Sequence, residues 1–256
     1  MTATPAWPPQ STPRLFVEKP LAPGPLRIDG PAAHYLLSVM RTAPGDPVKL
    51  FDDVTGEWLA TAVQVGRRDL TVDVSTRLRE REPVPDLWLC AAPLKKGRID
   101  WLAEKACELG VDRLLPVVTA RTIVDKLKTD RLRAHMIEAA EQCARTALPA
   151  VDEPVKLAAM LRDWPATRTL FFADEAGGDP AVAAMRAHPG PAAILIGPEG
   201  GFTDAERAMI REHSQAIGIS LGPRILRADT AAAAAATLWM AAAGGWYQSL
   251  LARSGA

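Results

Sequence analysis

The stretch Ile194-Leu195-Ile196-Gly197-Pro198-Glu199-Gly200-Gly201-Phe202-Thr203-Asp204-Ala205-Glu206 decides the fold of this chain. It begins with a short apolar run, which favours a buried strand. Glycines and a proline then interrupt the run and permit a tight turn. Thr203, followed three residues later by Glu206, predicts a capping box at the start of a helix. Strand, glycine-rich loop and helix is the arrangement by which α/β proteins bring bare backbone close to a ligand, although an ordinary βα turn has the same pattern.

A second bend follows at Leu221-Gly222-Pro223-Arg224-Ile225-Leu226-Arg227-Ala228-Asp229-Thr230, directly after the apolar run 216–221. It leads into six consecutive alanines, Ala231 to Ala236, and alanine is the best helix former. We expect Thr230, or else Asp229, to cap this last helix.

The bulk composition favours a water-soluble globular protein. The chain has 256 residues, 48% of them apolar, and no run of about 18 apolar residues that predicts a membrane span. The amino-terminal residues lack the pattern of a secretion signal, so we expect a cytoplasmic protein. Thirty basic and thirty acidic residues cancel, which is evidence against nonspecific coating of nucleic acid but leaves room for a local basic face.

Neither cysteine nor histidine spacing predicts a metal site. The three cysteines are far apart and form no Cys-x-x-Cys pair, so we expect neither a disulfide framework nor a zinc site. The four histidines likewise show no metal-ligand spacing.

The amino-terminal part, residues 14–76, reads as a small β-domain. Short runs with period-2 alternation predict five strands, at 15–17, 26–28, 48–51, 58–63 and 70–74. One helix is expected near 32–40. A barrel solves the edge-strand problem for such a set, and a sandwich is the alternative. The charged, proline-ended segment 77–85 predicts a linker.

The carboxy-terminal part, residues 86–250, reads as an α/β domain because strands alternate with helices around a mostly parallel sheet. Strands are expected at 87–92, 113–118 and 169–173, and helices at about 99–109 and 131–144. The two glycine-containing bends follow later strands of the same sheet.

Several motifs in this order resemble the ribosomal RNA small subunit methyltransferase E family of the SPOUT superfamily. They are the two bends, "HYLLSVMR" from His34 with Gly45-Asp46, "KKGRIDWLAEKACELGV" from Lys95, and "EAAEQCART" from Glu138. The resemblance implies a SPOUT domain with a trefoil knot, preceded by a PUA-like β-barrel that binds RNA. It also implies S-adenosyl-L-methionine as cofactor, N3 of a uridine in 16S ribosomal RNA as target, and a homodimer. The small-residue helix that ends in Trp239, Trp246 and Tyr247 agrees with a dimer.

The glycines of both bends explain how the cofactor is held. Without a Cβ, the backbone can approach a ligand and adopt positive φ. The cofactor-binding residues that we assign are Phe172, Ile196, Gly197, Pro198, Glu199, Gly200, Gly201, Leu221, Gly222, Ile225, Leu226 and Arg227, with Asp174 beside Phe172 as a further wall.

Loss of the N3 proton places negative charge on the carbonyl oxygens of the uracil ring, and an arginine would stabilise that charge. Arg227 is the first catalytic candidate and Arg145 the second. Glu199 could orient a base, a donor or the cofactor, or it could simply bond loop amides. No side chain is identified as the general base.

A basic cluster of Lys95, Lys96 and Arg98 follows a strand and is the predicted RNA-binding site, although such a cluster can be merely a solvated face. Two other functions stay open: a SPOUT 2′-O-ribose methyltransferase, and a noncatalytic RNA-binding protein with the same fold. A P-loop nucleotidase is excluded because no Gly-x-x-x-x-Gly-Lys-Ser/Thr stretch occurs.

Overall fold

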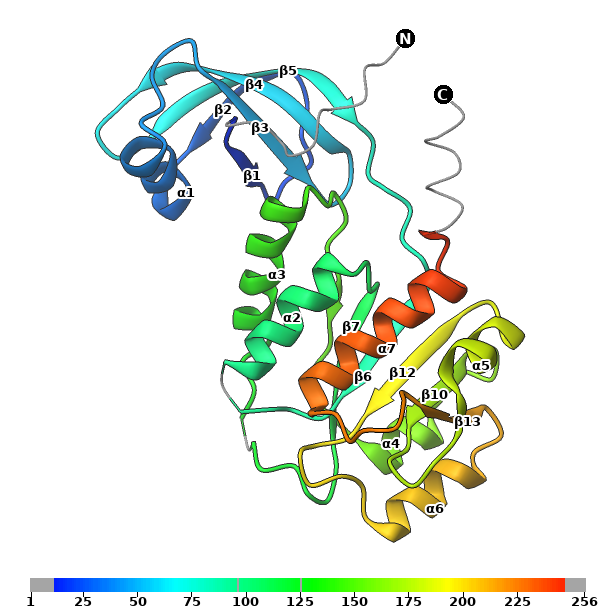
Figure 1. Ribbon diagram of the computed structural model, residues 1–256. Helices are drawn as coiled ribbons and strands as arrows, with labels where there is room; N and C mark the ends of the chain where they lie inside the picture. Colours follow the sequence, from blue (N-terminus) through cyan, green and yellow to red (C-terminus); the bar gives the residue numbers. More distant parts are fainter. Residues whose placement is uncertain (1–11, 96, 125, 247–256) are drawn as a thin grey trace. The chain divides into compact units, whose positions relative to one another are not determined.

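The computed structural model describes residues 12–95, 97–124 and 126–246, and the chain divides into two compact units (Figure 1). The first unit comprises Met1–Pro83 and Ala140–Leu148, and the second comprises Val84–Ala139 and Pro149–Ala256. The first unit is therefore discontinuous in sequence. Over the described residues, no helix has both the length and the apolar character that a membrane span requires.

The first unit contains a five-stranded sheet in the order β1-β3-β4-β5-β2. β1 pairs parallel with β3, and the other pairs are antiparallel. The strands are β1 Arg14–Phe16, β2 Gly24–Ile28, β3 Pro47–Asp52, β4 Gly56–Val65 and β5 Leu70–Arg79. Alternate residues such as Val48, Leu50 and Val72 enter one apolar core, which Leu36 completes from the helical segment.

The five strands predicted in this part of the chain are confirmed. The predicted helix 32–40 is also present, but it begins earlier, as α1 Gly30–His34, and continues as a π-helical turn over Tyr35–Val39. The linker predicted at 77–85 is wrong at its start, because β5 runs on to Arg79. Arg77 and Arg79 pair with Trp58 and Glu57 of β4, so these charges belong to a strand with an exposed face.

A buried carboxylate links this sheet to the segment 140–148. Glu57 accepts hydrogen bonds from Arg14 at 2.5 Å and from Arg79 at 2.9 Å. The same two guanidinium groups donate to backbone carbonyls at and just after the end of helix α3 (Thr129–Cys143), those of Ala140, Ala144 and Arg145. Helix-terminal carbonyls carry partial negative charge and lack partners within the helix, so these contacts satisfy them.

The second unit is built on an eight-stranded parallel sheet with the path β11-β13-β10-β12-β6-β7-β8, and β9 pairs with β7. Its strands are β6 Leu87–Ala91, β7 Arg113–Val118, β8 Ala150–Val151, β9 Val155–Lys156, β10 Thr169–Ala173, β11 Asp179–Pro180, β12 Ala192–Ile196 and β13 Ala216–Ser220. Every residue of β12 is buried, as expected for a central strand covered on both faces. The α/β fold class with a parallel sheet is thus confirmed.

Over the described residues, the α-helices after α1 are α2 Arg98–Glu108, α3 Thr129–Cys143, α4 Leu157–Arg162, α5 Ala181–Ala187, α6 Asp204–Glu212 and α7 Ala228–Ala242. Helices cover both faces of this sheet (Figure 1). Helix α7 packs against α2, α5, β6 and β12 on one face, whereas α4 packs against β7 and α6 on the other.

The alanine run forms helix α7, as predicted. Its buried residues recur every three to four positions, in the order Ala228, Ala231, Ala232, Ala235, Ala236, Trp239 and Met240. A stripe of methyl groups lets a helix lie close to its neighbours. The predicted capping is wrong: the N-cap is Arg227, without a side-chain cap, and Asp229 and Thr230 lie within the first helical turn.

Candidate functional site

A cavity of about 540 Å³ lies in the second unit, at the carboxyl ends of the neighbouring strands β12, β10 and β13. Three segments line it, namely residues 173–177 after β10, most of 196–202 after β12, and 219–228 after β13. The carboxyl ends of parallel strands are where α/β proteins bind ligands, and the volume suits a small molecule.

The loop between β12 and α6, residues 197–203, has the predicted form. The amide of Gly201 donates to the carbonyl of Pro198 at 2.9 Å, and Gly201 has a φ of +67°. Thr203 and Glu206 form the predicted capping box, with a hydrogen bond from each backbone amide to the other side chain. Burial acts to raise the pKa of Glu206, but hydrogen bonds from the amides of Thr203 and Ala120 and from the Thr203 hydroxyl bring it below its ordinary value. The loop is therefore anchored at its helical end by a carboxylate that stays ionised.

The second loop, residues 221–227, also lines the cavity and is more exposed than the first. Gly222 has a φ of +122°, and a Cβ added there would meet no atom within 4 Å. Ile225 is 86% exposed, and Arg224 and Arg227 are also exposed. Neither arginine forms an ion pair with any residue that the structure describes, so both guanidinium groups are available to an anionic or polar ligand.

Most of the predicted cofactor residues meet in this cavity. Those that line it are Ile196, Gly197, Pro198, Glu199, Gly201, Leu221, Gly222, Ile225, Leu226 and Arg227, and Asp174 lines it as well. Gly200 and Phe172 do not line it: Gly200 faces Arg121, and Phe172 lies in the apolar core beneath the sheet. Arg145 is buried in the 140–148 segment of the first unit and is not among the lining residues.

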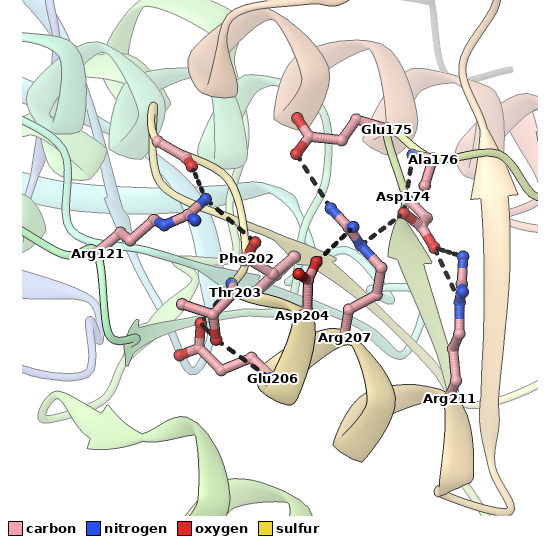
Figure 2. A network of polar contacts seen from close by, with 11 residues as sticks. Arg121, Asp174, Glu175, Ala176, Phe202, Thr203, Asp204, Glu206, Arg207 and Arg211 are labelled. Atoms are coloured by element: carbon pink, nitrogen blue, oxygen red, sulfur yellow. Dashed lines mark hydrogen bonds and ion pairs between the residues drawn. The ribbon is translucent and has the colours of Figure 1, made fainter.

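A charged network that the sequence did not predict borders the cavity (Figure 2). Asp174, whose side chain is 1% exposed, binds Arg211 at 2.5 Å and Arg207 at 3.2 Å, and accepts from the amide of Ala176. Arg207 also lies 3.1 Å from Glu175 and 3.5 Å from Asp204. Arg207 lines the cavity, so three carboxylates fix the position of one cavity-wall guanidinium.

The described residues of the predicted RNA-binding cluster differ in their surroundings, and neither Lys95 nor Arg98 lines the cavity. Lys95 is exposed, and Lys96 lies outside the described residues. The Arg98 guanidinium lies 3.5 Å from Oε1 of Glu199 and 3.8 Å from Oδ2 of Asp229. Arg98 therefore connects the start of α2 with the glycine loop and with the first turn of α7.

Gly201→Ala is expected to lower the stability of the protein, because Gly201 has a φ of +67°, a backbone conformation that residues with a Cβ rarely adopt. An added methyl group would also meet the Glu175 carboxylate, which would have to move. We expect a loss of about 1–2 kcal/mol in the free energy of unfolding. Thermal denaturation of the variant would measure it. Gly30→Ala is a matched control, because Gly30 has nearly the same φ, +62°, but has no atom within 4 Å of an added Cβ and does not line the cavity. An equal loss in both variants would show that the contact with Glu175 adds nothing.

Comparison with known proteins places the chain among RNA-modifying enzymes. A family model described as an RNA methyltransferase domain matches residues 80–240, more than half of the chain, and an RNA methyltransferase PUA domain matches residues 28–75. Ribosomal RNA small subunit methyltransferase E of Synechocystis sp. is 30% identical, over 77% of this chain and 67% of that protein. The protein of the same name from Rickettsia conorii is 28% identical, over 78% of this chain and 82% of its own length. A solved structure of the Neisseria gonorrhoeae protein of that name, bound to S-adenosyl methionine, has 25% identity and a TM-score of 0.81, covering 92% of this chain and 99% of that one.

Proposed function

The chain belongs to the ribosomal RNA small subunit methyltransferase E family, and from that premise we propose that it methylates N3 of a uridine in 16S ribosomal RNA, with S-adenosyl-L-methionine as methyl donor. One observation carries the proposal: both glycine-containing bends line the same cavity, with Arg227 in its wall. The sequence motifs that resemble the family are therefore assembled into one site.

The residues of the cavity fit this cofactor. At Gly222 an added Cβ would project into open space, so a ligand can approach the main chain there. Apolar side chains such as Ile196 and Leu226 share the lining with backbone polar groups, a combination typical of small-molecule sites. S-adenosyl-L-methionine supplies a methyl group bound to a positively charged sulfur. The residues that would hold it are those of the two bends, 196–201 and 221–227.

The target base must be unpaired, because N3 lies on the pairing edge of uracil. When the N3 proton leaves, negative charge develops on the two carbonyl oxygens that flank N3. Arg227, exposed and without an acidic partner among the described residues, would stabilise that charge. Glu199, held by Arg98 at 3.5 Å, would orient groups at the same end of the cavity.

The two parts of the chain would have separate roles. Residues 14–76, as a PUA-like barrel, would bind RNA. Residues 86–250 would bind the cofactor and carry out methyl transfer. Of these, residues 247–250 lie outside the described part. Lys95 would add a basic contact for RNA. Because α7 returns from β13 to pack on β6 and β12, we include a trefoil knot in the proposal. The ribosomal substrate would place the protein in the cytoplasm.

Nucleoside mass spectrometry tests the proposed reaction. Small-subunit RNA and assembled subunits that lack the modification would each be incubated with the protein and methyl-labelled cofactor, then digested to nucleosides. We expect label in 3-methyluridine. Label on a ribose 2′ oxygen would replace the proposal with the ribose methyltransferase reading, and absence of label would support the noncatalytic RNA-binding reading.

We also propose that the protein is a homodimer. Trp239 is buried within its own unit and so is not available for a partner, and Tyr247 lies outside the described residues. Large apolar side chains that remain exposed in the second unit include Trp101 at 38%, Trp246 at 36% and Ile225 at 86%. Light scattering at micromolar concentration is expected to give twice the 27.5 kDa chain mass. A stable monomer would contradict this.

A further inference from the structure

Arg121 contacts the glycine loop, residues 197–203, but does not line the cavity. It projects from a tight turn after β7, in which the amide of Thr119 donates to the Thr122 hydroxyl at 2.9 Å. Its Nη1 donates to the carbonyl of Gly200 at 2.6 Å and to that of Phe202 at 3.3 Å (Figure 2). One side chain thus holds two carbonyls of a loop that lies about 80 residues further along the chain.

The residue before Arg121 binds the same loop at its helical end. The amide of Ala120 donates to Oε1 of Glu206 at 2.7 Å, while Oε2 of Glu206 completes the capping box with Thr203. The turn at 119–122 therefore fixes both the middle of the loop and the start of α6.

The loop has two distinct sides. Gly197 and Gly201 line the cavity, whereas Gly200 does not, and a Cβ added at Gly200 would lie 3.4 Å from Cδ of Arg121. Glycines lose more conformational entropy on ordering than other residues do. Without Arg121, the carbonyls of Gly200 and Phe202 would rely on water, and the loop would occupy more conformations before a ligand arrives.

We propose that Arg121 is a positioning residue that holds the glycine loop in its ligand-binding conformation before the cofactor binds. Arg121 does not line the cavity, so it acts through the loop and not by touching the ligand or the reacting atoms. This inference rests on the proposed function, because it concerns the affinity of the same site for the cofactor. Preorganisation of this kind raises affinity by reducing the entropy lost on binding.

Calorimetry with S-adenosylhomocysteine, the demethylated product, tests the inference. Arg121→Met keeps the aliphatic stem beside Gly200 but removes the donors, and we expect its dissociation constant to rise about tenfold. Arg121→Lys restores a cationic donor that is one bond shorter, so its affinity should lie between those of Arg121→Met and the wild type. In turnover assays, KM for the cofactor should rise while kcat at saturating cofactor changes little.

A control variant separates this role from the loss of any exposed arginine. Arg162→Ala removes an arginine that pairs with Asp163 at 2.7 Å and does not line the cavity, so its dissociation constant should match that of the wild type.

Hydrogen exchange of ligand-free protein gives a second measurement. Amides of residues 197–204 should exchange faster in Arg121→Met and be partly protected again in Arg121→Lys. If the wild type binds S-adenosylhomocysteine but Arg121→Met binds it equally well, or shows unchanged hydrogen exchange, this inference is overturned and the proposed function is not. A wild type that does not bind would overturn the proposed function, and this inference with it.

Discussion

Replacing Arg227 with alanine is expected to lower the rate of methylation about 10²–10³-fold while leaving the fold intact. The guanidinium has no acidic partner among the described residues, so it can meet charge that develops on the substrate. The variant should fold because Arg227 is the N-cap of α7 without a side-chain cap, so no structural hydrogen bond is lost there. Single-turnover rates with saturating cofactor and RNA would measure the effect.

Arg186→Ala provides the comparison, because Arg186 is an exposed arginine of α5 that does not line the cavity. Arg227→Lys keeps the positive charge and should retain part of the activity. If Arg227→Ala turns over as fast as the wild type, the catalytic assignment is lost. Arg224, the other exposed arginine of the same loop, would then be the next candidate.

Glu57→Gln is expected to produce the largest loss of stability, about 3–5 kcal/mol in the first unit. The Glu57 side chain is 5% exposed and accepts from both Arg14 and Arg79. The Arg14 side chain is 6% exposed, so removal of the carboxylate leaves a buried positive charge without its counter-ion. Hydrogen exchange of peptides from β3, β4 and β5 would report the local free energy of opening.

The same carboxylate makes this unit sensitive to acid. Burial acts to raise the pKa of Glu57, but the hydrogen bonds from Arg79 and Arg14 outweigh it and lower the pKa below the ordinary 4.5. A carboxylate with a lowered pKa in the folded state contributes its full stability above the ordinary pKa and loses it as the pH falls through the folded-state value. Wild-type protection should therefore decline below about pH 4.5, whereas Glu57→Gln should lack this contribution throughout and show a flatter profile.

Glu80→Gln is the matched control for this result. Glu80 is 81% exposed and pairs with Arg77 at 3.2 Å, so water screens the pair, and its loss should change stability by less than about 1 kcal/mol. Equal effects at positions 57 and 80 would show that the buried cluster is not what stabilises the unit.

The backbone of the site was predictable because its signals are local. The apolar run, the glycines and the Thr203–Glu206 pair lie within thirteen residues, and the structure confirms a strand, a loop and a capped helix there. The alanine run was likewise predictable as a helix. Its start was not, since Asp229 and Thr230 are good capping residues but the helix begins one residue before them.

The charged side chains of the site were harder to predict because they come from different strand ends. Asp174 and Arg207 meet only because β10 lies between β12 and β13, and no spacing in the sequence encodes that order. Arg121 reaches the loop because only β6 separates β7 from β12, and the sequence does not encode that order either. Arg145 lies in the segment 140–148, which belongs to the first unit, and its catalytic role stays a prediction.

The discontinuity of the first unit has a consequence for biosynthesis. The backbone carbonyls that accept hydrogen bonds from Arg14 and Arg79 belong to residues 140–145. These residues leave the ribosome well after strand β5. Domains that are continuous in sequence can fold as soon as they emerge. Here the amino-terminal sheet emerges first, and Arg14 and Arg79 gain these carbonyl partners only after much of the following unit has been translated.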